Sequence, residues 1–393
     1  MTQHTSNPFE DGTLQSRTAT GRAPTAPAIP DHPPAPAVAG QPRMGLLGLP
    51  IVAAGFIVLG ILLGGPQTAL ETAGPIATFA LPVLAASALW WQGWPFQRQR
   101  QPLAGLLNLT VIILGGTALT ILAQAIVGRV DLPGLFTSAA PGSTTFSSFP
   151  WLMPLGVLIF VATLQITFVN ERWPFVKVPG PASGFLVVAT SWVVGIVAYL
   201  LVVNWDFVPE PAREAIRLKN PGGPVNGLEL LGWLAIVTAF QVLFYIGLGG
   251  WPTKYIRNTT VRLLAANLFV IGGGWLTWAL LANVLGWETP TIAALGGSVA
   301  AAAVLSAILF DDWPASRLTS DGARLAGTAV QIAVLTALLF FGLRALGNAL
   351  QTWDRDPVEL WVTVSCLNFI AATAIAHVAV FHRWPIGPPK SIG

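Results

Sequence analysis

Ten apolar segments of about 20 residues follow one another along this chain, and no other feature constrains its fold as strongly. An α-helix of about 20 residues crosses the hydrocarbon core of a bilayer, which is about 30 Å thick. Only 9% of the residues are charged and 53% are hydrophobic, whereas roughly 25% of the residues of a soluble domain are charged. The sequence therefore predicts an all-α, polytopic integral membrane protein with about ten transmembrane helices.

Five Trp-Pro dipeptides divide these segments into pairs. Proline disfavours helical geometry in the residue before it, and tryptophan prefers the headgroup level of a membrane, so each dipeptide is expected to end a helix at the interface. The pairs predict five parallel helical hairpins, approximately residues 44–95, 102–174, 181–252, 259–314 and 323–385. The interface motif consists of Trp94, Pro95, Trp173, Pro174, Trp251, Pro252, Trp313, Pro314, Trp384 and Pro385.

A local likeness between the second and fourth hairpins supports a repeat. Arg98 is followed ten residues later by Asn108-Leu-Thr-Val-Ile-Ile-Leu-Gly-Gly116, and Arg257 is followed ten residues later by Asn267-Leu-Phe-Val-Ile-Gly-Gly-Gly274. This match favours duplication of a hairpin, and convergent use of Trp and Pro at membrane interfaces is the alternative. Because each unit crosses the membrane twice, the copies would be parallel, unlike those of inverted-repeat transporters.

The distribution of basic residues predicts the orientation of the chain. Two crossings per hairpin bring all five Trp-Pro dipeptides to one side, and cytoplasmic loops carry an excess of Lys and Arg. The Trp-Pro side, with both termini, carries fourteen basic residues and the opposite side carries six. The sequence therefore predicts a protein of the plasma (inner) membrane with cytoplasmic N- and C-termini. The fourteen are Arg17, Arg22, Arg43, Arg98, Arg100, Arg172, Lys177, Lys254, Arg257, Arg262, Arg317, Arg324, Arg383 and Lys390.

The first 42 residues differ in composition from the rest. They interleave proline with Ala, Thr and Gly, and such a segment cannot bury enough apolar surface to offset its chain entropy. We expect a disordered Pro/Ala-rich cytoplasmic tail over residues 1–42, followed by one transmembrane domain over residues 43–393. The tail lacks the pattern of a secretory signal, so the first helix is expected to be retained.

Polar side chains inside the predicted spans are the candidate ligand-binding residues, because an unsatisfied polar group in lipid costs several kcal/mol. The neutral amides could bind a polar solute, although hydrogen bonding between helices is the more common use of such groups. The histidine could shuttle protons, or it could be a neutral imidazole near the interface. The candidates are Asn108, Gln165, Gln241, Asn267, Gln331 and His377, with Asn368 as a further amide at membrane depth.

Chemistry that needs clustered ionisable groups has no support in the sequence. No Asp or Glu lies in the middle of a predicted span, which disfavours the carboxylate relays of proton- or sodium-coupled carriers. Cys366 is the only cysteine, so a disulfide within the chain or a cysteine-based metal site is excluded. Hydrolase, zinc-protease and nucleotide-binding motifs are absent from the sequence. We therefore expect no catalytic residues, no metal and no cofactor.

A permease or channel-like protein for a small neutral or apolar solute is the leading interpretation, because ten spans far exceed what an anchor needs. The alternative is a non-transporting membrane scaffold or an assembly subunit of a membrane complex. An intramembrane enzyme is third. The expected partners are membrane lipids and either further copies of the chain or other membrane subunits, and nucleic acid is not expected. A cavity lined by the amides would favour transport, whereas closely packed repeats would favour the scaffold.

Overall fold

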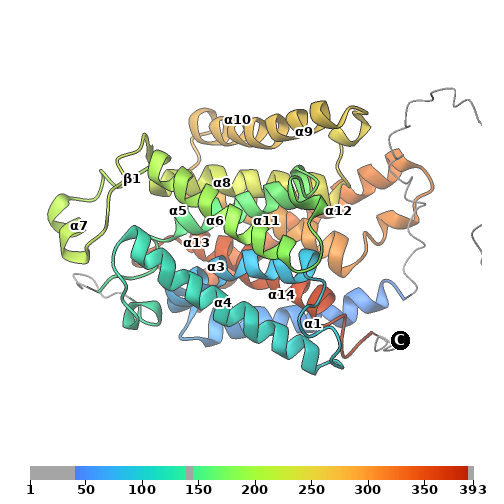
Figure 1. Cartoon of the computed structure of the whole chain (residues 1–393), viewed down its shortest axis with the longest axis horizontal. Coiled ribbons are helices and arrows are strands. Elements are labelled where there is room, and N and C mark those ends of the chain that lie inside the picture. The colour runs from blue at the N-terminus through green and yellow to red at the C-terminus, as the bar shows by residue number, and fades with distance from the viewer. Residues whose placement is uncertain (1–39, 139–144, 388–393) are drawn as a thin grey trace, which may run out of the picture.

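The computed structural model describes residues 40–138 and 145–387, and most of them lie in helices (Figure 1). Nine helices of this described part are long and apolar enough to cross a membrane. The shorter apolar helix Met153–Val169 lies fourth in order, and at 1.5 Å per residue it extends about 25 Å. Most of the predicted tail, residues 1–39, lies outside the described residues. We number the ten helices as spans, from the first to the tenth.

Several spans change winding along their length, so that one span comprises more than one element. The first span comprises α1 (Arg43–Ile57) and η1 (Val58–Leu62); the second comprises α2 (Pro66–Thr68), η2 (Ala69–Ala73), α3 (Gly74–Ala85) and η3 (Ala86–Trp90); the third is α4 (Leu103–Val127); the fourth comprises α5 (Met153–Leu164) and η5 (Gln165–Val169); and the fifth is α6 (Ala182–Val202). The sixth span comprises α8 (Gly227–Val242) and η7 (Leu243–Gly247); the seventh comprises α9 (Thr259–Asn267), η9 (Leu268–Gly272), α10 (Gly273–Ala279) and η10 (Leu280–Val284); and the eighth comprises α11 (Thr289–Val304) and η11 (Leu305–Leu309). The ninth span is α12 (Asp321–Leu350), and the tenth comprises α13 (Val358–Val364), η13 (Ser365–Ala371), α14 (Ala372–Ile375) and η14 (Ala376–Val380).

The second span begins earlier than the sequence suggested. The apolar run predicted a helix from about Gly74, but the helix starts at Pro66, and proline at a first helical position lacks only an amide that would be unpaired there anyway. Gly65 precedes it with a φ of 90°, a conformation that favours glycine. The additional turns bring Glu71 into the helix, where its side chain is buried.

The five even-numbered spans form an inner ring. In the second, sixth, eighth and tenth spans, 56–78% of the most apolar stretch is buried, compared with 17–28% in the five odd-numbered spans. The fourth span buries most of α5 as well. The second span contacts the fourth, the fourth contacts the sixth, the sixth contacts the eighth, and the eighth contacts the tenth. The tenth span in turn contacts the second, which closes the ring. The odd-numbered spans surround this ring, and the helices run roughly parallel to the long axis of Figure 1.

The hairpins occupy successive positions around the ring. The third, fifth, seventh and ninth spans each pack against the inner span that precedes them in sequence. The first span packs against the tenth span. It thereby occupies the place beside the tenth span that each other odd-numbered span occupies beside the inner span preceding it. The fold therefore closes on itself between its first and last hairpins.

Small residues allow the inner helices to approach closely. A Cβ atom at Gly296 of α11 would lie 2.7 Å from the carbonyl carbon of Ala235 in α8. Real Cβ contacts are not this short, so the backbones of the sixth and eighth spans would have to separate. A Cβ atom at Gly156 of α5 would likewise lie 2.9 Å from Cγ2 of Thr78 in α3. These contacts make the ring a packed core across most of its circumference.

All five inner spans end with the same backbone conformation. Each helix finishes in a π-helical turn four residues before its tryptophan, at Trp90, Val169, Gly247, Leu309 and Val380. Two residues with positive φ then turn the chain, such as Asp311 (50°) and Asp312 (56°). The tryptophan amide next donates to the carbonyl oxygen three residues earlier, over 2.8–3.2 Å. Short 3-10 turns follow three of the junctions: η6 (Phe175–Lys177), η8 (Thr253–Tyr255) and η12 (Ala315–Arg317).

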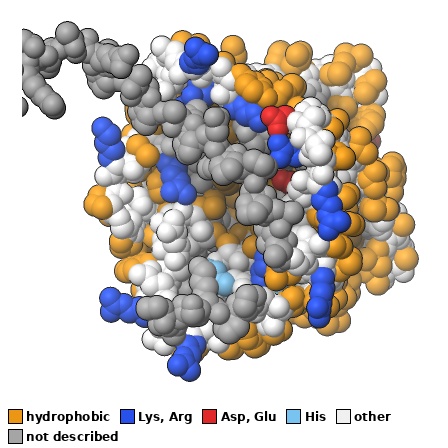
Figure 2. All heavy atoms as spheres, turned by 90° about the vertical axis from the view of Figure 1, so that its right-hand side faces the viewer, with side chains coloured by type: hydrophobic (Ala, Val, Ile, Leu, Met, Phe, Trp, Pro, Cys, Tyr) orange, Lys and Arg blue, Asp and Glu red, His pale blue; other side chains and the backbone are white. Residues whose placement is uncertain are grey.

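The ends of the bundle differ in charge. Neighbouring junctions meet at one end, where Arg172 Nη2 donates to the Leu89 carbonyl oxygen over 3.0 Å, and we call this end the Trp-Pro face. Figure 2 views the end that carries the C-terminus and shows blue Lys and Arg side chains around it. Its described basic residues exceed its described acidic residues, which are Glu171, Asp311, Asp312 and Asp321. At the opposite end the described acidic residues are the more numerous: Glu71, Asp131, Asp206, Glu210, Glu214, Glu229, Glu288, Asp354, Asp356 and Glu359.

Two loops cover part of that opposite end. One contains η4 (Pro133–Leu135), and the other contains α7 (Glu210–Ile216) and the parallel pair β1 (Val203–Asn204) and β2 (Val225–Asn226). The indole of Trp205 is fully buried between them, and its Nε1 donates to Tyr199 Oη over 3.0 Å. The described residues of these loops, 129–138, 145–152 and 203–226, are therefore folded against the end of the bundle.

Candidate functional site

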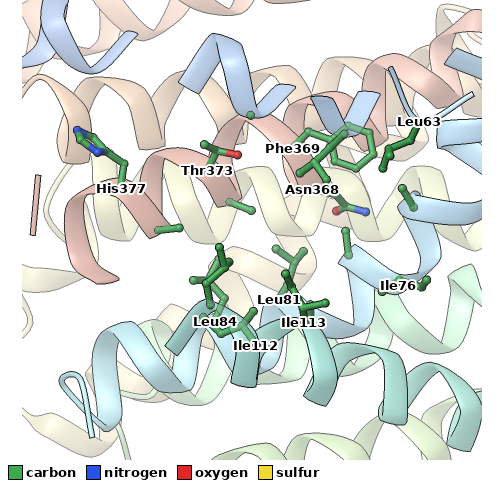
Figure 3. A pocket seen from close by; sticks show the side chains of 18 of the residues that line it. Leu63, Ile76, Leu81, Leu84, Ile112, Ile113, Asn368, Phe369, Thr373 and His377 are labelled. Atoms are coloured by element: carbon green, nitrogen blue, oxygen red, sulfur yellow. The ribbon is translucent and has the colours of Figure 1, made fainter. Parts of the chain in front are cut away.

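A cavity of about 810 Å³ lies where the ring closes between the first and last hairpins. The first and tenth spans line one side of it, and the second and third spans line the other (Figure 3). Leu63, directly after the first span, and Ile113 on the third are 47% and 51% exposed, although both line the cavity. The cavity is therefore partly open between these two outer helices, toward the outer surface of the bundle.

The cavity is long and narrow in the direction of the helices. Its lining on the second span extends from Thr68 to Leu84, which corresponds to about 24 Å of α-helix. At the Trp-Pro face it ends at Phe381 and Trp384, and at the other end it reaches Phe136 in the loop after the third span. It therefore extends along most of the roughly 30 Å of hydrocarbon in a bilayer.

Most of the lining is aliphatic or aromatic, and a few polar groups interrupt it. Asn368, Thr373 and His377 follow one another along the tenth span, at three different depths (Figure 3). Thr68 and Thr72 add hydroxyl groups at the end away from the Trp-Pro face. Such a lining suits a hydrocarbon chain better than an ion, since an ion would lose its hydration shell without replacement.

Asn368 links the two inner spans that flank the cavity. Its Nδ2 donates to the carbonyl oxygen of Gly74 over 2.9 Å and to the hydroxyl of Thr78 over 2.7 Å. Gly74 also allows Val364 of α13 to approach, since a Cβ atom there would lie 3.1 Å from the valine side chain. The second and tenth spans are thus joined at the level of Asn368, and the cavity lies beside this contact.

His377 is the one of the six predicted ligand-binding residues that lines the cavity. It is 4% exposed and lies in η14, one helical turn beyond Thr373. A Cβ atom at Gly48 of the first span would lie 3.3 Å from its Nε2, so the glycine leaves room for the imidazole. The histidine therefore stands between the cavity and the first span near the Trp-Pro face.

Three other predicted residues contact one another away from the cavity. Gln241 Nε2 in the sixth span donates to Gln165 Oε1 in the fourth over 2.7 Å, and Gln165 Nε2 donates to Asn267 Oδ1 in the seventh over 2.8 Å. Asn267 Nδ2 continues the chain to Asn170 Oδ1 over 2.6 Å. These amides join three helices, and their role in binding a ligand stays a prediction.

Asn108 and Gln331 lie apart from both groups. Asn108 Nδ2 donates to the Ala104 carbonyl oxygen over 3.0 Å and to that of Gly93 over 3.4 Å, so the side chain ties the third span to the first Trp-Pro junction. Gln331 belongs to the ninth span, and its Oε1 is buried with no hydrogen-bond partner in the described part of the chain. The structure therefore brings together only part of the predicted set.

A polar cluster near the far end of the cavity was missed by the sequence interpretation. The Glu71 carboxylate accepts a hydrogen bond from Gln67 Nε2 over 2.6 Å and from Ser138 Oγ, and it forms an ion pair with Arg355 at 3.1 Å. Asp356 accepts a second hydrogen bond from Gln67, also over 2.6 Å. Burial, and next the negative charge of Glu71, raise the pKa of Asp356, although the hydrogen bond from Gln67 opposes this change. The Gly-Gly-Pro stretch before the helix was the available signal for an earlier start.

The described residues contain no group of three or more His, Cys, Asp and Glu side chains that could hold a metal ion. Comparisons with family models, with curated proteins and with solved structures find no significant match to this chain.

Proposed function

We propose that this protein is a multi-pass membrane permease for an apolar or weakly polar molecule that enters from the lipid. The observation that carries the proposal is the cavity between the first, second, third and tenth spans. Its volume of about 810 Å³ lies within the roughly 300–1,000 Å³ of typical ligand sites. Its opening between two outer spans admits a molecule that is already dissolved in the bilayer.

The shape of the cavity supports movement of such a molecule along the membrane normal. A lining about 24 Å long offers hydrocarbon contacts across most of the bilayer. Polar groups at different depths on the tenth span, Asn368, Thr373 and His377, would let a weakly polar head pass without losing every hydrogen bond. Four of the predicted amides, Asn108, Gln165, Gln241 and Asn267, form hydrogen bonds within the protein, and none of the predicted amides among the six candidates lines the cavity, so the solute class proposed here is narrower and more apolar.

We also propose an orientation of the chain in the membrane and an origin of its five hairpins by duplication. The excess of basic residues on the Trp-Pro face supports a cytoplasmic location for that face and for the N- and C-termini, in a plasma or inner membrane. The shared hydrogen bonds of the five junctions and the cyclic order of the hairpins support duplication of an ancestral hairpin.

A transport assay tests this proposal. The protein would be reconstituted in liposomes whose two leaflets carry an amphiphile with a short fluorescent chain, and the fraction protected from an external quencher would be followed. Wild-type protein should move the probe. The double variant Ala77→Phe/Ala372→Phe, which places two phenyl groups in the cavity, should slow movement at least about tenfold. Val334→Phe, on an exposed position of the ninth span, is the matched control and should keep the wild-type rate.

A membrane scaffold is the second candidate, and one observation favours it. The ninth span presents Val330, Val334, Leu338 and Phe341 as an exposed apolar stripe, each 54–65% exposed. A partner helix could pack against such a stripe. Probe movement equal to that of empty liposomes, together with a membrane protein that copurifies in fixed stoichiometry, would contradict the permease and support the scaffold.

A further inference from the structure

We propose that the molecule bound in the cavity is an anionic phospholipid, with an acyl chain between the spans and its phosphate at the Trp-Pro face. This inference rests on the proposed function, since it names the class of molecule that the same cavity takes. It follows from three observations: the length of the cavity, the basic residues at one end of its two outer walls, and the acidic residues at the other end.

The cavity is long enough to hold a lipid chain and matches its apolar chemistry. An acyl chain of one leaflet extends through about half of the 30 Å hydrocarbon thickness, and the lining of the second span is about 24 Å long. Phe381 and Trp384 line the cavity at the Trp-Pro face, where an indole prefers the level of the headgroups. A chain entering beside these rings would therefore reach about the middle of the membrane and would lie within the cavity over its whole length.

Basic residues that form no ion pair within the described part of the chain precede both outer walls of the cavity at this end. Arg43 is the first residue of α1, and Arg98 and Arg100 lie in the loop before α4, so both outer walls begin with positive charge. None of the three forms an ion pair with any residue in the described part of the chain. By contrast Arg383, on the tenth span side, is held by Asp311 at 2.8 Å.

Side-chain and glycine contacts hold these basic segments against the tenth span. Gln101, directly after Arg100, donates from Nε2 to the carbonyl oxygen of Val380 over 3.0 Å. Gly105 of α4 lies against the ring of Phe381, which lines the cavity. On the other wall Gly48, five residues after Arg43, faces His377. The guanidinium groups therefore belong to segments that border the mouth, where they can attract a phosphate.

The charge at the opposite end sets the direction of the lipid. Thr68 and Thr72 line that end of the cavity, and Glu71 lies in the same helical turn. Asp356 adds a second carboxylate, whereas Arg355 supplies one positive charge. A phosphate placed there would be repelled, so the anionic head is expected at the Trp-Pro face and not at the far end.

Lipid retention measured by native mass spectrometry tests the inference. Full-length protein would be equilibrated in nanodiscs with equal amounts of phosphatidylglycerol and phosphatidylcholine of identical acyl chains, and the bound lipids would be counted after release. The wild type should retain one phosphatidylglycerol per chain, preferred by at least about tenfold. The variant Arg43→Gln/Arg98→Gln/Arg100→Gln should lose about tenfold of that retention.

A matched variant separates this site from the general charge of the face. Lys177→Gln/Lys254→Gln/Arg257→Gln removes the same charge from exposed positions after the fourth and sixth spans, away from the cavity. It should change retention by no more than about twofold. Equal losses in both triple variants, or equal retention of the two lipids by the wild type, would overturn the inference. Retention unchanged by Ala77→Phe/Ala372→Phe would do so too, because the lipid would then lie elsewhere.

The outcomes distinguish this inference from the proposed function. Selective retention that depends on the first triple variant, without probe movement in liposomes, would leave the lipid site in place and remove the permease. Probe movement without any preference for phosphatidylglycerol would support the permease and overturn the anionic lipid site. The thermal midpoint of each variant, measured in the same detergent, controls for misfolding.

Discussion

Asp312, at the fourth Trp-Pro junction, offers a prediction with a defined sign and size. Its carboxyl is half-buried behind the end of the eighth span, and Ser306 Oγ donates to its Oδ1 over 3.2 Å. Burial, and then the negative charge of Asp311, raise the pKa of Asp312 from 3.8 to about 6, although the hydrogen bond from Ser306 opposes the change. At pH 7 the folded protein therefore carries an ionised group that its surroundings disfavour.

The magnitude follows from the change in pKa. Each pKa unit corresponds to about 1.4 kcal/mol, so a rise from 3.8 to about 6 gives a cost of at most about 3 kcal/mol once the group is ionised. Water still reaches this position and screens the charge, which reduces the expected cost to about 1–2 kcal/mol. Because the pKa in the folded state is raised, the cost is absent below about pH 4, grows between pH 4 and 6, and is constant above that range.

Asp312→Asn removes the charge and keeps the oxygen that Ser306 contacts, and asparagine tolerates the φ of 56° well. The thermal midpoint of the variant at pH 7 should exceed that of the wild type by roughly 2–4 °C. The difference should vanish near pH 4. Asp311→Asn is the matched control: it weakens contacts with Arg383 and Gln41 at 2.8 and 2.6 Å and should lower the midpoint. A gain that does not change with pH, or a loss at pH 7, would refute the reasoning.

Three further substitutions probe the packing and the polar contacts of the bundle. Glu171→Gln weakens two charge-assisted hydrogen bonds of 2.7 and 2.8 Å to Arg262, which is 8% exposed. The substitution should cost about 1–3 kcal/mol in the free energy of unfolding, and an unchanged denaturation midpoint would count against a structural role of this ion pair. Gly296→Ala should lower the thermal midpoint by several degrees, whereas Gly342→Ala, which meets open space, should leave it unchanged or raise it. Gln241→Leu leaves Gln165 Oε1 without its donor and removes a second hydrogen bond to the Val161 carbonyl oxygen, which keeps the backbone amide of Gln165. The substitution should cost about 1–3 kcal/mol in the free energy of unfolding, measured by the same denaturation, and a more stable variant would contradict this.

The ends of the helices could be read from the sequence because they depend on local chemistry. Each Trp-Pro dipeptide lies close to the end of a helix, but the tenth span already ends at Val380, four residues before Trp384, and His382 and Arg383 with positive φ turn the chain before the proline is reached. The start of the second span was placed too late because Gln67 and Glu71 interrupt the apolar run. Those polar side chains find partners in distant loops, and a local pattern does not contain that information.

The site depends on long-range contacts, so less of it could be predicted. Intramembrane amides stood out as polar residues, but Gln165 and Gln241 use their hydrogen bonds on each other. The cavity exists because the first and last hairpins meet at the closure of the ring, and its aliphatic lining resembles that of any other span. His377 was found because an ionisable residue in a span is rare, whereas Ile112 and Ala372 carried no distinguishing signal.

The central claim is that the cavity between the first and last hairpins holds an elongated apolar molecule. A density map of the purified protein in lipid nanodiscs tests it most directly. Continuous non-protein density should lie between Ile112 and Thr373 and extend toward Trp384. A map in which the first and tenth spans pack directly against the second and third, with no density between them, would contradict the account.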